Sequence, residues 1–167
     1  FEEILRNYLN TPYVLTLNSA TAGLTLALRL LKQPQGFFDE KEDFVLTPVL
    51  TCFATTASIL ANNANIRWVD VDPMTGNVDL NDIRRKLSPK TKVIYIVHWA
   101  GSPVDLDELE SIKNECMQKY GFRPMIVEDC AHAFGAEWNG RGRVDQGQAH
   151  DRIQQPELLH QHIQRDH

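Results

Sequence analysis

The stretch Lys92-Val93-Ile94-Tyr95-Ile96-Val97 decides the fold class of this chain. Its apolar residues are nearly continuous, and most of them are β-branched or aromatic, which favours a strand. A strand that alternates apolar and polar residues has one face in water, whereas a continuous apolar run is typical of a strand covered on both faces. The stretch therefore predicts a strand in the middle of a covered sheet.

Working outward from this strand, apolar runs alternate with amphipathic segments. Further strands are predicted at residues 13–17, 44–46, 66–71 and 125–128. Helices are predicted from Ser19 or Thr21 to about Lys32, over residues 51–62, from Asp79 to Leu87, and from Asp105 to Tyr120 with Gly121 as the C-cap. Alternating strands and helices predict an α/β fold with three layers (α/β/α) and a mostly parallel sheet.

Composition limits the kinds of function. The chain has 167 residues, 43% hydrophobic and 23% charged, which is enough to build one domain with a sizeable core. The formal net charge of −5, without a basic block, disfavours nucleic-acid binding. No apolar run is long enough to span a bilayer. The acidic start Phe-Glu-Glu does not resemble a signal peptide, and three irregularly spaced cysteines favour a reducing cytoplasm over a disulfide framework or a zinc site.

Three polar clusters follow predicted strands, at residues 18–21, 98–101 and 128–132. Ligands of parallel sheets gather at the carboxyl ends of the strands, so these clusters indicate a site. The first cluster is either an ordinary helix cap or a phosphate site at a helix N-terminus. Asp129 could bind a metal, accept a phosphoryl group, pair with a cationic ring nitrogen, or only cap a helix. His132 would face the same pocket if residues 129–133 turn helically, and Cys52 is either a nucleophile at a helix start or a packing residue.

Five segments, in order along the chain, together resemble the DegT/DnrJ/EryC1/StrS aminotransferases over about residues 1–140. They are Asn18-Ser19-Ala20-Thr21-Ala22-Gly23-Leu24, Thr47-Pro48-Val49-Leu50-Thr51-Cys52-Phe53-Ala54-Thr55, Trp68-Val69-Asp70-Val71-Asp72-Pro73, Val97-His98-Trp99-Ala100-Gly101-Ser102-Pro103-Val104-Asp105 and Ile126-Val127-Glu128-Asp129-Cys130-Ala131-His132-Ala133-Phe134-Gly135.

The resemblance implies a fold-type I enzyme that uses pyridoxal 5'-phosphate. By resemblance, the amides of Ala20 and Thr21 and the Thr21 hydroxyl hold the cofactor phosphate, with alanine where the family often has glycine. Cys52 stands where the family usually has an aromatic residue stacked on the pyridine ring. Asp129 is expected to pair with the protonated ring nitrogen, and His132 to face the cofactor and the substrate. No metal site is implied.

The implied reaction moves an amino group from an amino acid such as glutamate to a keto-sugar nucleotide, in a homodimer. A pyridoxamine-dependent sugar dehydratase of the same fold is the alternative, and a non-catalytic remnant or binding module is another. A phospho-acceptor or Rossmann-like domain is disfavoured because no G-x-G-x-x-G follows the first strand.

The amino-acid composition of the chain changes after Gly140. Residues 141–167 contain six Gln and four of the six His but no Lys and no aromatic residue. We expect residues 1–140 to be part of a cofactor-binding large domain, and residues 141–167 to be an atypical tail that is read out of frame or disordered. No lysine follows Lys119, so the family's Schiff-base lysine is missing and the chain alone is not expected to transfer amino groups. A metal site at His160 and His162 is disfavoured because residues two apart do not share a helix face.

Overall fold

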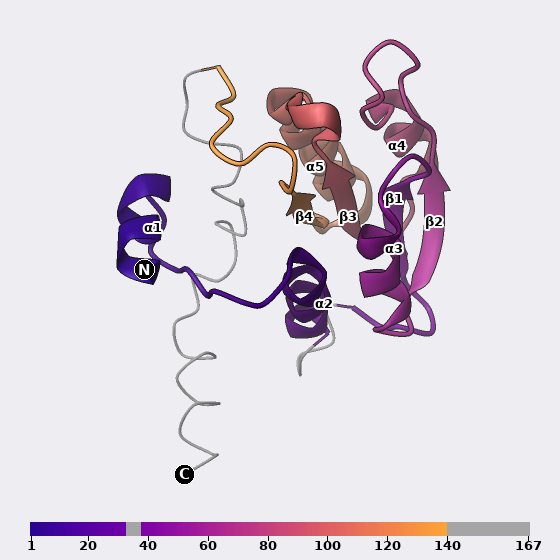
Figure 1. Ribbon diagram of the computed structural model, residues 1–167. Coiled ribbons are helices and arrows are strands. Elements are labelled where there is room, and N and C mark those ends of the chain that lie inside the picture. Colours follow the sequence, from indigo (N-terminus) through magenta and orange to yellow (C-terminus); the bar gives the residue numbers. More distant parts are fainter. Residues whose placement is uncertain (33–37, 140–167) are drawn as a thin grey trace.

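The structure, a computed structural model, describes residues 1–32 and 38–139. A parallel sheet of four strands lies at its centre, in the order β2-β1-β3-β4 (Figure 1). The strands are β1 (Phe44–Pro48), β2 (Asn65–Val69), β3 (Thr91–Val97) and β4 (Met125–Asp129). The predicted strand at residues 92–97 is thus confirmed, and it is an interior strand, as its continuous apolar character indicated.

Five α-helices are described. They are α1 (Glu2–Leu9), α2 (Ala20–Leu31), α3 (Phe53–Leu60), α4 (Leu80–Lys86) and α5 (Leu106–Tyr120), together with a short 3-10 turn at Trp99–Gly101. The helix predicted from residue 51 begins two residues later, and β1 continues two residues further than expected, to Pro48. The strand predicted over residues 66–71 ends at Val69, because Val71 instead bridges to Val78 in an antiparallel contact.

Local sequence signals account for the longest helix. The Asp105 side chain accepts a hydrogen bond from the Glu108 amide at 2.9 Å, which caps the N-terminus of α5. At the other end Gly121 has φ 78°, the left-handed conformation in which glycine ends a helix without steric cost. Both predicted boundaries of this helix are confirmed.

Successive side chains of the central strand enter two separate cores. Val93 and Tyr95 pack with Leu28 and Ile59 in the layer of α2 and α3. The intervening side chains enter a second buried cluster on the opposite face, with residues of α4 and α5. That second cluster contains Leu46, Val69, Val78, Ile83, Ile94, Ile96, Val104, Leu109 and Ile112. The three-layer α/β/α arrangement follows from this period-two alternation between helix-covered faces.

The order of the strands places a switch point between β1 and β3. From β1 the chain passes through α3 to β2, on one side, and from β3 it passes through α5 to β4, on the other. The two connections leave the carboxyl ends of adjacent strands in opposite directions, so they leave room for a ligand between them. The topology therefore points to the edge where β1, β3 and β4 end.

The prediction of a strand over residues 13–17 is wrong. Tyr13, Leu15 and Leu17 alternate as in a strand, yet their side chains are 60%, 66% and 45% exposed. The carboxylate of Glu2 accepts hydrogen bonds from the amide and the hydroxyl of Thr16, at 2.7 and 2.8 Å. The Glu2 side chain thus accepts the hydrogen bond of the Thr16 amide, which a neighbouring strand would otherwise accept. Within the described residues, no strand pairs with this extended segment.

No helix in the described parts of the chain is both long enough and apolar enough to span a bilayer.

We expect Thr47→Val to stabilise the protein by about 1 kcal/mol. Thr47 is fully buried in β1, and its hydroxyl has no hydrogen-bond partner among the described residues. Valine has the same shape without the polar atom. The control is Thr91→Val, since Thr91 is equally buried but accepts a hydrogen bond from the Ser88 amide at 3.1 Å. Denaturant unfolding should show opposite signs for the two variants, and a loss of stability in Thr47→Val would contradict the expectation.

Candidate functional site

Asp129 ends β4 at the edge that the topology singles out. It is 8% exposed, and it lies on the face of the sheet that α2 and α3 cover. One carboxylate oxygen, Oδ1, accepts a hydrogen bond from the Ala131 amide at 3.1 Å. The other, Oδ2, accepts one from the Thr55 hydroxyl at 2.7 Å. A carboxylate can accept about four hydrogen bonds, so roughly two positions stay open for a further donor.

Thr55, in the first turn of α3, and Thr51, just before the N-cap of that helix, form a hydrogen-bonded chain to this carboxylate. Thr55 is fully buried and donates to Asp129, because an ionised carboxylate can only accept. The Thr51 hydroxyl donates to Thr55 at 2.8 Å. The chain links β4 to α3 and fixes the direction in which the carboxylate points.

The start of α2 offers free backbone donors. The Ser19 hydroxyl accepts from the Ala22 amide at 3.2 Å and caps the helix. Within the described residues, the amides of Ala20 and Thr21 have no acceptor, and Thr21 is half-buried while Ala20 is exposed. Free amides and the helix dipole favour an anion at such a place.

Helix α2 is held against the same face of the sheet as Asp129. It contacts α3 and β4 (Figure 1). The buried Tyr95 hydroxyl donates to the carbonyl of Leu24, in the second turn of α2, at 2.9 Å. Burial, and to a lesser degree the charge of Asp129, raise the pKa of Tyr95, so its hydroxyl stays protonated and remains a donor. The helix start and the carboxylate thus belong to one packed unit.

The Cys52 thiol is exposed at the N-cap of α3. The side chain makes no capping hydrogen bond, and the backbone carbonyl accepts from the Thr55 amide at 3.1 Å. Cys52 is therefore three residues before the threonine that holds Asp129. Phe53, one position later, is 74% exposed.

His132 lies in a series of turns after Asp129 rather than in a regular helix. Its side chain is exposed, and its ring meets the Trp99 ring edge-on, with centroids 5.8 Å apart and planes at 65°. Among the described residues, no hydrogen bond joins His132 to Asp129. Residues 98–101 and 128–132, two of the three predicted clusters, are therefore in contact through these two rings.

A third group of polar side chains lies on the opposite face of the sheet. His98, Glu128 and Cys130 hold potential metal ligands within 4.8 Å of one another. The His98 Nδ1 atom accepts from the Val104 amide at 3.0 Å, so the ring proton is on Nε2, which donates to Glu128 at 3.0 Å. A metal bound at Nε2 would require the ring proton to be on Nδ1. There it would face the N–H group of Val104, which now donates to Nδ1. The geometry therefore favours a buried hydrogen-bonded pair over a metal centre. The pair His160 and His162 lies outside the described residues.

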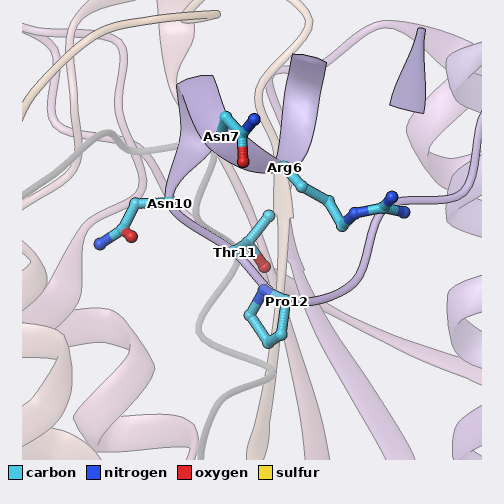
Figure 2. A pocket seen from close by; sticks show the side chains of 5 residues that line it. All are labelled: Arg6, Asn7, Asn10, Thr11 and Pro12. Atoms are coloured by element: carbon cyan, nitrogen blue, oxygen red, sulfur yellow. The ribbon is translucent and has the colours of Figure 1, made fainter. Parts of the chain in front are cut away.

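One depression among the described residues lies away from this edge. It has a volume of about 600 Å³ at the end of α1 and is lined by Arg6, Asn7, Asn10, Thr11 and Pro12. Figure 2 shows that the Arg6 and Asn10 side chains extend to opposite sides rather than converge. No residue predicted for the site lines it.

A carboxylate at a strand end, free amides at a nearby helix start and an open switch point are typical of α/β proteins that bind a phosphorylated ligand at the carboxyl edge of the sheet. The chain belongs to the DegT/DnrJ/EryC1/StrS aminotransferase family, whose model matches residues 1–150. This family and the structural neighbours are pyridoxal-phosphate-dependent aminotransferases of fold-type I.

Three relatives illustrate the similarity. A Streptomyces kanamyceticus protein, assigned by name as an L-glutamine:3-amino-2,3-dideoxy-scyllo-inosose aminotransferase, is 36% identical over 141 residues, 84% of this chain and 31% of its own. The sugar aminotransferase CalS13 from Micromonospora echinospora is 46% identical with a TM-score of 0.73, over 80% of this chain and 35% of CalS13. Spr1654 from Streptococcus pneumoniae, described as a sugar aminotransferase and solved in its PLP form, is 32% identical with a TM-score of 0.70, over 80% and 35%. The chain spans about a third of each relative.

Sequence reasoning placed Cys52 at the site but missed the contribution of Thr51 and Thr55. Thr51 and Thr55 are four residues apart, which places both on one face of the helix predicted over residues 51–62, and they follow a predicted strand. That signal was present, but threonine in a buried helix is also an ordinary packing residue. The contact between Trp99 and His132 had no local signal, since it depends on the register of β3 against β4.

Proposed function

We propose that this chain supplies part of the cofactor site of a sugar-nucleotide aminotransferase, within the large domain formed by residues 1–140. The reaction is the transfer of an amino group from an amino acid such as glutamate to a keto-sugar nucleotide. Family membership supports amino transfer to a sugar, and the relatives' names support a sugar-related substrate. Because the relatives are more than twice as long as this chain, we assign the whole activity to the full-length protein that they represent, which we take to be a homodimer.

The observation that carries the proposal is the buried, doubly hydrogen-bonded carboxylate of Asp129 at the carboxyl end of β4. Two hydrogen-bond donors hold this carboxylate in place, and its open positions suit an N–H donor. Pyridoxal 5'-phosphate, when bound, supplies a cationic ring that draws off the negative charge formed when a substrate C–H bond breaks. We assign to Asp129 the task of holding the proton on the ring nitrogen.

The other predicted residues take complementary roles. The free amides of Ala20 and Thr21, with the Thr21 hydroxyl, would hold the phosphate at the start of α2. Cys52, exposed at the start of α3, would present its sulfur to the ring where relatives usually place an aromatic side chain. His132, braced by Trp99, would face the cofactor and substrate.

We expect Asp129→Asn to weaken binding of pyridoxamine 5'-phosphate by about tenfold or more, since hydrogen bonds to charged groups are worth about 1.5 to 3 kcal/mol. Pyridoxamine phosphate is the suitable probe because its binding requires no lysine. The measurement is calorimetric titration of the full chain and of the variant, with circular dichroism to check the fold.

An analogue with carbon in place of the ring nitrogen is the matched control for this experiment. It cannot donate to Asp129, so both proteins should bind it equally. If the unsubstituted chain binds the natural compound and the analogue with the same affinity, Asp129 does not engage the ring nitrogen, and the assignment fails.

A further inference from the structure

We propose that Thr55 is a positioning residue, which with Thr51 orients the Asp129 carboxylate toward the ring nitrogen of the cofactor. The proposal rests on the function proposed above and assigns a role to a helix that family resemblance did not connect to Asp129. Its basis is the hydrogen-bonded chain from Thr51 through Thr55 to the Oδ2 atom of Asp129, with steps of 2.8 and 2.7 Å.

The direction of the chain follows from the chemistry of its ends. The carboxylate accepts only, so the Thr55 proton points toward Asp129, and the Thr55 oxygen is left to accept from Thr51. Each hydroxyl in such a chain polarises the next, which strengthens the bond to the charged end. The buried position of Thr55 keeps water from replacing it.

The two bonds to Asp129 come from different elements. Ala131, in the turn after β4, holds Oδ1, and Thr55, on α3, holds Oδ2. A carboxylate fixed at both oxygens cannot rotate about its terminal torsion, so its free lone pairs keep one direction. Without the Thr55 hydroxyl, only the local bond within the turn would remain, and the carboxylate could swing away from the ring.

A neighbouring threonine provides the matched control. Thr56 is also buried on α3, but its hydroxyl donates to the carbonyl of Phe53, one turn back, at 3.1 Å. Thr55→Val and Thr56→Val therefore remove the same atom from the same helix, and only the first removal affects Asp129. Thr55→Ser restores the hydroxyl without the methyl group.

The experiment titrates pyridoxamine 5'-phosphate, and its analogue without the ring nitrogen, into the full chain and the variants. We expect Thr55→Val to weaken binding of the natural compound about fivefold, while leaving the analogue unchanged. Thr55→Ser and Thr56→Val should stay within about twofold of the unsubstituted chain. With ¹⁵N-labelled ligand, the ring-nitrogen resonance should move toward the unprotonated position in Thr55→Val alone.

The possible outcomes separate this inference from the proposed function. If Thr55→Val weakens binding of both ligands equally, Thr55 shapes the pocket without acting through Asp129, and the inference is overturned while the function stands. If the unsubstituted chain does not discriminate between the ligands, the proposed function fails and the inference fails with it. If Thr55→Val does not fold, Thr51→Val provides the test. Loss of the Thr51 hydroxyl, which donates to Thr55, should weaken binding of the natural compound by about twofold and leave binding of the analogue unchanged.

Discussion

Replacing His98 with leucine is expected to lower the free energy of unfolding by about 3 to 5 kcal/mol, because it leaves two buried polar groups, one of them a carboxylate, without a hydrogen-bond partner. The His98 side chain is fully buried, and its partner Glu128 is 5% exposed. Leucine fills much of the same space but leaves the Glu128 carboxylate without its donor. It also leaves the buried Val104 amide without the Nδ1 acceptor. The measurement is denaturant unfolding of the full chain.

Two further variants show whether the loss in the free energy of unfolding comes from leaving the Glu128 carboxylate without a hydrogen-bond donor. Glu128→Gln keeps an oxygen that accepts from Nε2, so it should cost only about 1 kcal/mol. Removing both partners, as His98→Leu with Glu128→Leu, should be less harmful than His98→Leu alone. If the double variant is at least as unstable as His98→Leu alone, the two side chains do not act as a pair.

The fold was predictable where the sequence carries a local pattern. The continuous apolar run at 92–97 identified an interior strand, and Asp105 and Gly121 marked both ends of a helix. The segment at 13–17 is also a short apolar run but did not form a strand, because pairing is decided by a neighbour and not by the segment itself. Its Thr16 amide is bonded to Glu2, 14 residues away.

The candidate site was predictable only in its outline. Parallel strands bring their carboxyl ends to one edge, and this rule predicted that Asp129 lies at a strand end on that edge, where the structure has it. The rule does not predict which side chains meet at that edge. The bond between Thr55 and Asp129 joins residues 74 positions apart, and the opposite roles of adjacent Glu128 and Asp129 depend on which face of β4 each one occupies.

Gly76 is constrained by a residue distant in the sequence, Trp99, whose ring contacts His132. It has φ 72°, and a Cβ atom there would lie 2.5 Å from the Cδ1 atom of Trp99. Trp99 cannot move away easily, because its amide donates to the Asn77 side chain at 2.9 Å and its ring packs on His132. Asn77 in turn donates to the carbonyl of Ser102 at 3.1 Å, so the two loops are joined.

We therefore expect Gly76→Ala to lower the free energy of unfolding by about 3 kcal/mol, from left-handed strain together with the collision with the indole. Gly121→Ala is the matched control, since Gly121 has φ 78° but no atom within 4 Å of an added Cβ. It should cost only the backbone strain, about 1 kcal/mol. In a Trp99→Ala background the collision is removed, so the cost of Gly76→Ala should fall to that of Gly121→Ala. Equal costs for the two glycine variants in the unsubstituted background would show that Trp99 yields freely and does not brace His132.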